Sequence, residues 1–398
     1  MNRLHIDIGS TYFKISANGV TDQYFRDFNI DIYDDVQNKC ANLLTKYSKE
    51  NIFICSSANG GLSTLIIGIT SLFSIKYATN IAFNSGINII DTLLYSKIDT
   101  AIPPKESIDV VIIAGGIDNV KPKFDKRLLE YLKEVNYQNI VYVGNNIDRP
   151  FLEKNITNLV VLPNIIKDKL QIREEELKEY LTNLYQSDIV GKEDIKKLYN
   201  ITSNQIYSTP YIVNNSLSVL GELYSDVTDP FLLIDIGGAT TDIHYSTDLI
   251  ENKNILTNSG YDRLVFKKLG VYKSRESLVF GAKNNEFVYE LLDYLGVNEN
   301  ILEEYSPKAT VILMQLAIFL VLYQVSKNYN NYVTLKLDIL NSIVLTGGIS
   351  KVLHDNDIDR IVKFFYKKIL HYSTIPKIII DRDYKIWTLG IKEIHHVR

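Results

Sequence analysis

Two strands that each end in Asp-Ile-Gly constrain this chain more than any other feature. In the second of them, the apolar run 231–236 carries Asp235 near its end and turns through Gly237 and Gly238 into an alternating run at 241–246. Consecutive apolar residues predict a central strand that is covered on both faces. A carboxylate at the end of such a strand lies where open α/β sheets place their chemistry, and glycines let amide N–H groups approach an anion. The stretch predicts a hairpin that binds phosphate together with a divalent cation.

The same pattern occurs at the start of the chain. The apolar run 4–8 contains Asp7 and leads into the hydroxyls of Ser10 and Thr11, and a third glycine turn follows another apolar run at 347–348. A single Asp-x-Gly turn is common and carries little information. Three strand-to-glycine turns, two of which open with Asp-Ile-Gly, predict a nucleotide site.

The order of strand and helix patterns indicates an α/β protein. Alternating runs at 4–8, 12–17 and 22–27, a helical pattern at 31–49 and a strand at 51–55 predict an antiparallel β-β-β-α-β unit. Beyond it, strand patterns alternate with helical ones, which predicts an inserted parallel α/β subdomain with strands at 65–70, 87–91, 110–114, 140–143 and 159–162. The glycines of 56–62 suit either an anion site or a helix start, and 167–197 reads as charged helices.

Bulk properties exclude several classes of protein. A formal charge of −4 and a pI of about 5.9 argue against a protein that holds nucleic acid. Cys40 and Cys55 fit neither a zinc site nor a disulfide framework, so we expect a cytoplasmic protein, and no targeting segment precedes the strand at 4–8. The apolar stretch 309–325 follows Ser306-Pro307, a helix start, and we interpret it as a buried core helix rather than a membrane span.

The three glycine turns, in this order, resemble the actin/Hsp70/sugar-kinase superfamily of ATP-binding folds. The resemblance implies two ribonuclease-H-like lobes, with phosphate-1 at 7–11, phosphate-2 at 235–242 and the adenosine loop at 346–350. The two connecting helices would lie at 214–225 and after Lys351. The implied domains are 1–57 for the first part of lobe I, 58–205 for the insertion, 206–230 for the connecting helix region and 231–398 for lobe II.

Longer strings resemble one family within this superfamily, the glutamate mutase accessory proteins, also called GlmL or MutL. The strings are NIFICSSANGGL, VVIIAGGID, LLIDIGGATTDIH and SIVLTGGIS. Membership implies an ATP-dependent reactivase that helps an adenosylcobalamin-dependent mutase, its protein client, to release damaged cobalamin. A homodimer is compatible with this role. The family usually carries the acidic string E-G-D-L-G after phosphate-2, whereas this chain has Lys267 and Lys268 there.

The resemblance also implies roles for individual residues, with ATP and Mg²⁺ as the bound groups. Asp7 and Asp235 would hold the metal through its waters and orient the attacking water, and Asp242 would assist. The residues expected to hold the nucleotide are Gly9, Ser10, Thr11, Gly237, Gly238, Ala239, Thr240, Thr241, Gly347, Gly348 and Ser350.

Other side chains near these turns have plainer interpretations. The alternation along its strand favours solvent for Lys14, although the side chain is long enough to reach a phosphate. His244 and Cys55 are expected to be packed rather than catalytic. Asp118 and Asn119, which follow the Gly115-Gly116 turn, suit ligand binding and turn formation equally well.

Three other functions remain open at the level of sequence. A small-molecule kinase would be revealed by a phosphorylated sugar or acid. An activator of radical dehydratases would need cysteines for an iron–sulfur cluster, for which Cys40 and Cys55 are poorly placed. An actin-like structural protein would sediment in a nucleotide-dependent way.

Overall fold

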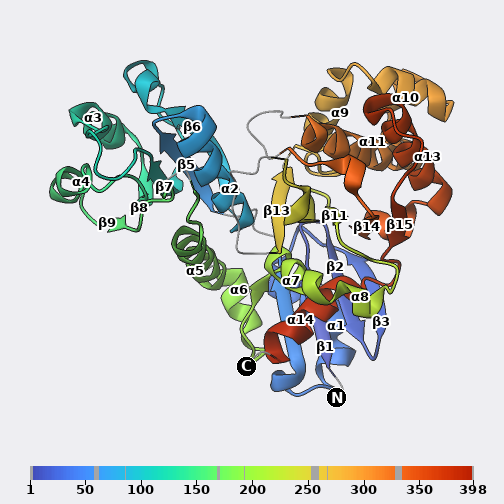
Figure 1. The fold of residues 1–398 in the computed structure, drawn as a ribbon. Helices are drawn as coiled ribbons and strands as arrows, with labels where there is room; N and C mark the ends of the chain where they lie inside the picture. Colours follow the sequence, from blue (N-terminus) through green and yellow to red (C-terminus); the bar gives the residue numbers. More distant parts are fainter. Residues whose placement is uncertain are drawn as a thin grey trace.

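Three five-stranded sheets organise the computed structural model of the chain (Figure 1). It describes residues 3–57, 62–85, 87–167, 171–191, 193–251, 260–266, 268–327 and 334–396. Two of the sheets belong to two lobes, and the third belongs to a subdomain that lies beside both lobes, on the left in Figure 1.

The sheet of lobe I has the order β10-β4-β1-β2-β3. Its central strand β1 pairs antiparallel with β2 and parallel with β4, and all five β1 residues are buried, as its apolar run predicted. Helix α1 (Ile32–Leu44) connects β3 to β4, and Asp31 caps its N-terminus. The strands are β1 (Leu4–Ile8), β2 (Tyr12–Ala17), β3 (Val20–Phe25), β4 (Ile52–Ser56) and β10 (Tyr207–Ser208).

The sheet of lobe II repeats this arrangement with the order β13-β12-β11-β14-β15. Here β11 is central, antiparallel to β12 and parallel to β14. If the strands of each lobe are numbered along the chain, both sheets have the order 3-2-1-4-5. The strands are β11 (Phe231–Ile236), β12 (Thr241–Ser246), β13 (Tyr261–Phe266), β14 (Ser342–Gly347) and β15 (Lys377–Ile380).

The third sheet lies between β4 and β10 in the sequence and is parallel throughout, as the alternating pattern predicted. Its order β6-β5-β7-β8-β9 is that of doubly wound folds. The direction in which successive strands are added to the sheet reverses between β5 and β7. The elements are β5 (Ser63–Gly68), β6 (Asn88–Leu94), β7 (Ile108–Ala114), β8 (Tyr137–Tyr142), β9 (Leu159–Val161), the π-helix η2 (Ser71–Ile75), the 3₁₀-helix η3 (Tyr95–Thr100), α2 (Lys76–Asn84), α3 (Lys126–Glu134) and α4 (Arg149–Asn155).

Helices tie the inserted subdomain to both lobes. Helix α5 (Glu175–Gly191) packs against α2, and α6 (Glu193–Leu198) packs against α1 of lobe I. Helix α2 also contacts β13 of lobe II (Figure 1). One apolar core runs without a break from β1 through α2 and α5 to the inserted sheet. A movement of one lobe therefore reaches the inserted subdomain through packed side chains.

Two helices connect the lobes. Helix α7 (Thr209–Ser216) leaves β10 of lobe I, and α14 (Lys385–His396) follows β15 of lobe II, so the two occupy equivalent places in the two lobes. They pack against each other, and the short α8 (Leu220–Leu223) packs against α14. The first helix begins five residues earlier than the 214–225 predicted, because Pro210 suits the first turn of a helix.

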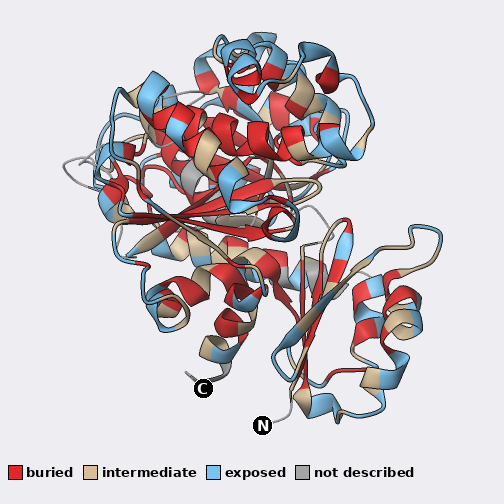
Figure 2. Ribbon diagram, turned by 90° about the vertical axis from the view of Figure 1, so that its right-hand side faces the viewer, coloured by how far each residue is buried: buried red, intermediate tan, exposed pale blue. Residues whose placement is uncertain are grey.

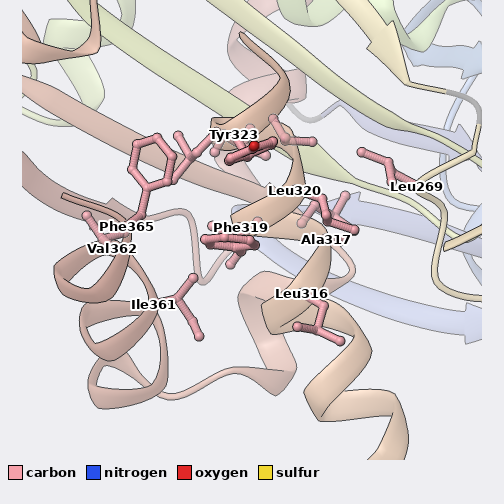
Figure 3. Packing of buried hydrophobic residues seen from close by; sticks show 14 of the residues in the cluster. Leu269, Leu316, Ala317, Phe319, Leu320, Tyr323, Ile361, Val362 and Phe365 are labelled. Carbon is pink, nitrogen blue, oxygen red and sulfur yellow. The ribbon is translucent and has the colours of Figure 1, made fainter. Parts of the chain in front are cut away.

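The long apolar helix α11 (Pro307–Ser326) lies in the core of lobe II. Ser306 caps it by accepting a hydrogen bond from the N–H of Ala309 at 3.1 Å. In the described residues it is the one helix long and apolar enough to cross a membrane, but 78% of its most apolar window is buried inside the protein. Phe319 and Leu320 pack toward α13 (Asp355–Phe365) and the sheet (Figure 3). This burial supports the core-helix interpretation.

Burial follows the layers of the two lobes (Figure 2). The central strands and the inner faces of the helices are buried, whereas the edge strands β3 and β15 and the outer helix faces are more exposed. Lobe II carries three more helices, α9 (Arg275–Lys283), α10 (Val288–Leu295) and α12 (Ile349–Val352). Residues of α9, α11 and α12 line the cavity between the lobes.

Candidate nucleotide site

The two Asp-Ile-Gly hairpins, one from each lobe, face each other between the lobes. Each closes its turn with an equivalent bond, from the N–H of Gly9 to the carbonyl of Tyr12 at 2.9 Å and from the N–H of Gly237 to the carbonyl of Thr240 at 2.8 Å. Their tips touch, because a methyl group at Gly238 would overlap the side chain of Thr11. The duplicated sequence pattern therefore builds two equivalent turns at one place.

A cavity of about 1040 Å³ lies where the hairpins meet. Its walls come from both lobes and, through α5, from the inserted subdomain. The residues that line it include Asp7, Gly9, Ser10, Thr11, Tyr12, Lys14, Thr209, Asp235, Gly237, Gly238, Ala239, Thr240, Asp242, Arg263, Tyr272, Lys273, Arg275, Tyr305, Gly347 and Gly348. Most of the residues expected to hold a nucleotide thus share one cavity.

Asp7 is held by three side chains. Its Oδ2 accepts from Lys14 at 3.0 Å, and its Oδ1 accepts from Thr209 Oγ1 at 2.5 Å and from the Cys55 thiol at 3.5 Å. Thr209 begins α7, so this bond ties the connecting helix to the end of β1. Burial raises the pKa of the Cys55 thiol, with the Asp7 charge adding to it, so Cys55 is a packed thiol as expected.

Lys14 does not face solvent, which corrects the interpretation from its strand position. Its side chain is 14% exposed and lies at the base of the cavity between Asp7 and the ring of Tyr384, 5.1 Å from the ring centroid. Burial alone would lower the pKa of Lys14, but the carboxylates of Asp7 and Asp235 outweigh it and raise that pKa. Lys14 is therefore a permanent cation inside the cavity.

Asp235 is the free carboxylate of the site. Its side chain forms no hydrogen bond or ion pair with the part of the chain that the structure describes. Burial, reinforced by the charges of Asp242 and Asp7, raises the pKa of Asp235 to about 6, although Lys14 and Arg263 oppose the shift. A carboxylate with this environment is a candidate metal or water ligand.

Asp242 is occupied by partners, unlike Asp235. Arg263 of β13 binds it through Nε at 2.9 Å and through a second guanidinium nitrogen, and Thr240 donates to it at 3.0 Å. Tyr185 of α5 lines the cavity beside this pair, where burial is the main cause that raises its pKa to about 12. Tyr185 is thus a residue of the inserted subdomain that contributes to the site.

Two of the expected nucleotide ligands have side chains outside the cavity. Thr241 is buried and donates to the carbonyl of Leu269 at 2.8 Å, and Ser350 is buried and donates to the carbonyl of Gly347 at 2.9 Å. Both hydroxyls complete turns inside lobe II, so we exclude these side chains from the candidate site. His244 is packed as expected, with Nδ1 3.2 Å from Asn214 Oδ1.

Several residues of the site were not singled out by the sequence. Thr209, Arg263, Arg275 and Tyr305 come from segments without a glycine turn, and only the fold brings them to the cavity. The lysine string at 266–270 is only partly placed, since Lys268 is exposed and Lys267 lies outside the described residues. The glycines at 60–61 also lie outside them.

The donor set fits a metal that is bound through water. Within the described residues no three His, Cys, Asp or Glu side chains are grouped to hold a metal ion directly. Mg²⁺ usually keeps several waters and takes one or two carboxylates together with phosphate oxygens. The free Asp235 carboxylate beside Lys14 and the glycine turns supplies such a set.

The repeated sheets and the shared cavity define a two-lobed protein with the actin-like ATPase fold. A sequence model described as MutL protein matches residues 3–311, so the chain belongs to the MutL protein family, the glutamate mutase accessory family that its strings resemble. Protein MutL of Clostridium tetanomorphum is 24% identical over an alignment of 286 residues that covers 67% of this chain. The aligned region covers 62% of the length of that relative.

Solved structures overlap with the chain only loosely. A ROK family glucokinase from Streptomyces griseus, in complex with glucose and AMPPNP, is 11% identical with a TM-score of 0.35 and 99% coverage of both chains. The activator of the 2-hydroxyisocaproyl-CoA dehydratase from Clostridium difficile, with bound ADPNP, is 12% identical with a TM-score of 0.30, covering 99% of this chain and 94% of the other.

Proposed function

We propose that this chain is an ATP-dependent reactivating chaperone for an adenosylcobalamin-dependent mutase of the glutamate mutase type. The proposal rests on membership of the MutL protein family and on one structural observation. That observation is the meeting of two equivalent Asp-Ile-Gly hairpins at one cavity, which also contains the cation of Lys14 and the carboxylate of Asp235, the latter without a partner among the described residues.

The turns and their hydroxyls would hold the phosphate chain. The Gly9 and Gly237 turns approach from opposite lobes, and the hydroxyls of Ser10, Thr11 and Thr240 line the cavity beside them. Lys14 adds a buried positive charge at the base. Preorganised donors and cations of this kind stabilise the charge that develops on a transferring phosphoryl group.

Asp235 would hold Mg²⁺ through a water, with Asp7 as its neighbour. The metal would supply charge neutralisation at the phosphates. Because its three partners keep Asp7 in place, we assign Asp7 to fixing Lys14 and α7, and Asp235 to orienting the attacking water. With a pKa of about 6, Asp235 is largely ionised at neutral pH and can accept a proton.

The wall toward lobe II would receive the nucleoside. Gly347 and Gly348 leave β14 there, and Tyr272, Arg275 and Tyr305 of lobe II also line the cavity. The glycines allow a flat base to approach the backbone, and the aromatic and guanidinium groups offer stacking surfaces.

Closure of the lobes would be transmitted to the client by packed contacts. Tyr384, between β15 and α14, donates to Gln23 of lobe I at 2.5 Å and lies over Lys14. Tyr185 of the inserted subdomain lies beside the Asp242–Arg263 pair. A change in occupancy of the cavity thus acts on both lobes and on the inserted subdomain.

A small-molecule kinase is the second candidate function. The cavity extends past the carboxylates to Ile87, Tyr185 and Val265, which leaves room for an acceptor beside the phosphate chain. A screen of sugars and small acids with ATP, analysed for phosphorylated products, would reveal this activity.

The direct test uses a mutase inactivated by hydroxocobalamin. We expect the chain with Mg-ATP to release the bound cobalamin and to restore activity when adenosylcobalamin is supplied. Asp235→Asn should bind the mutase but release nothing, and Asp248→Asn, an exposed carboxylate of the same lobe, should behave as wild type. Release that proceeds equally without ATP would contradict the proposal.

A further inference from the structure

Exposed apolar side chains gather at the carboxyl edge of the inserted sheet. Ile117 and Val120 follow β7 and Ile147 follows β8, and they are 43%, 48% and 42% exposed. We call these three residues the docking edge. Among the described residues of 63–161, only Ile90 and Ile102 are other large apolar side chains with comparable exposure.

The loops that carry the docking edge are bonded to one another. Asn146 donates its backbone N–H to Asp118 Oδ1 at 2.9 Å, and its side chain accepts from the N–H of Asn119 at 2.8 Å. Asn164, beyond β9, donates to the carbonyl of Gly116 and to Asp118, both at 3.1 Å. Asp118 and Asn119 therefore form the turns, and three neighbouring loops are joined into one platform.

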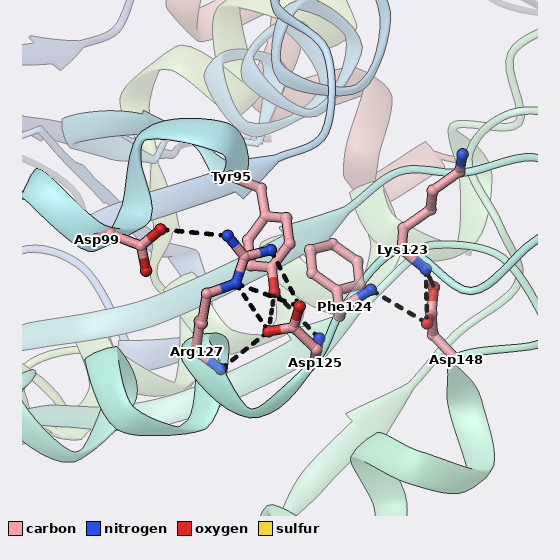
Figure 4. A network of polar contacts seen from close by, with 7 residues as sticks. All are labelled: Tyr95, Asp99, Lys123, Phe124, Asp125, Arg127 and Asp148. Atoms are coloured by element: carbon pink, nitrogen blue, oxygen red, sulfur yellow. Dashed lines mark hydrogen bonds and ion pairs between the residues drawn. The ribbon is translucent and has the colours of Figure 1, made fainter.

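A second network fixes the segment that leads from the platform into α3 (Figure 4). Asp148, at the start of α4, accepts from the backbone N–H groups of Lys123 and Phe124 at 2.9 and 3.2 Å. Arg127, at the start of α3, binds Asp125 through two guanidinium nitrogens. Because the loops are fixed before binding, a partner would lose little free energy in ordering them.

In the described part of the platform, the position where a small-ligand crevice would open is filled. In doubly wound folds such a crevice opens where the strand order reverses, here between β5 and β7. Ile69 fills that position, since a Cβ on Gly115 would lie 2.9 Å from its side chain. Asn145 is fully buried against Gly116. What remains accessible is the outer face with its three aliphatic side chains.

The rim of the docking edge is basic. Lys121, Lys123 and Lys126 are exposed and form no ion pair with the residues that the structure describes. The acidic residues of the same loops are already bonded, since Asp118 and Asp148 accept hydrogen bonds within the platform and Asp125 is paired with Arg127. Among the described residues, the three lysines are therefore charges left without a partner beside the docking edge. Aliphatic rather than aromatic side chains at the centre favour a protein over a single-stranded nucleic acid, which would stack its bases on aromatic rings.

We propose that the docking edge binds the client. The surface that it binds on the client would be an apolar face surrounded by acidic residues. This rests on the proposed function, in which the client is the adenosylcobalamin-dependent mutase. The aliphatic side chains would supply most of the affinity, and the lysines would steer the encounter and set its dependence on salt.

The test is calorimetric titration of each variant with the purified mutase from the cell that makes this chain, in the presence of Mg-ATP. We expect Ile117→Ser/Ile147→Ser to weaken binding by about tenfold or more. The matched control is Ile102→Ser, which changes a more exposed isoleucine of the same subdomain, 84% exposed, and should bind as wild type. Lys121→Glu/Lys123→Glu should weaken binding and reduce the loss of affinity that added salt causes.

The outcomes separate this inference from the proposed function. ATP hydrolysis without the mutase should be unchanged in every variant, which also reports that each one folds. If the wild type does not bind the mutase, the proposed function and this choice of partner are both wrong. If the wild type binds it and both double variants bind equally well, the docking edge is overturned while the proposed function stands.

Discussion

The carboxylate of Asp235 on β11 lies against the α-carbon of Gly347 on β14, so closely that a methyl group at 347 would overlap it. Gly347 also has a φ of +80°, a conformation that side chains disfavour. The carboxylate of β11 and the glycine turn after β14 are thus one packed unit, because Ile236 and Gly347 pair across neighbouring parallel strands.

Gly347→Ala should therefore impair both stability and activity. The positive φ and the overlap with Asp235 should lower the free energy of unfolding by about 1–3 kcal/mol, and the displaced carboxylate should abolish ATP hydrolysis. Urea denaturation and a phosphate-release assay measure the two effects. Gly348→Ala is the control for stability, because the nearest atom to its added methyl group is 3.8 Å away. An equal loss of stability at both positions would contradict the role given to Gly347.

Asp235→Asn should make the protein without nucleotide more stable. The folded pKa of about 6 exceeds the value of about 3.9 for an unfolded chain, so ionisation above pH 6 opposes folding. Stability from this group is present at low pH and is lost as pH rises through 6. Removing the charge should add up to about 3 kcal/mol at pH 8 and almost nothing at pH 4. Denaturation at both pH values checks this, and a variant less stable than wild type at pH 8 would refute it.

Lys14→Met should leave Asp7 as a buried carboxylate without its cation. Breaking a buried pair costs about 3–5 kcal/mol. The double variant Asp7→Asn/Lys14→Met should recover most of the stability, because both charges are gone, yet neither variant should hydrolyse ATP. A double-mutant cycle in urea measures the coupling. Additive effects of the two substitutions would mean that the 3.0 Å contact contributes no coupling energy.

Trp387, the only tryptophan of the chain, reports on the connecting helices. It belongs to α14 and its ring meets His5 of β1 edge-on, with centroids 6.1 Å apart. If the lobes move on binding, saturating Mg-ATP should change its fluorescence emission, and ADP should give a different value. Emission that stays constant while calorimetry records binding would show that the helices do not move.

The sequence predicted the parts of the fold that repeat a local pattern. The runs ending in Asp7 and Asp235 became central strands, and the charged segment after 167 became helices. Strand β13 was not predicted, because Asp262 and Arg263 interrupt its apolar run, although both are buried in the sheet. Polar residues that pair inside a fold resemble loop residues in a single sequence.

The site was predictable where it followed from the turns and not where it depends on contacts between distant segments. Lys14 has the alternation of an exposed residue, but in the fold it lies between Asp7 and Tyr384, which comes from lobe II. Thr241 carries a hydroxyl of the kind that binds phosphate, but its position in the strand directs this hydroxyl to the carbonyl of Leu269. The domain boundaries at 57–58, 205–206 and 230–231 remain predictions.

The central claim is that the two hairpins hold one triphosphate together, and calorimetric titration with Mg-ATP tests it most directly. We expect one site per chain, Mg²⁺-dependent, with affinity reduced by at least about tenfold when Lys14 is changed to Met and when Thr11 and Thr240 are both changed to Val. Binding that is absent in the wild type, or undiminished in these two variants, would contradict the account.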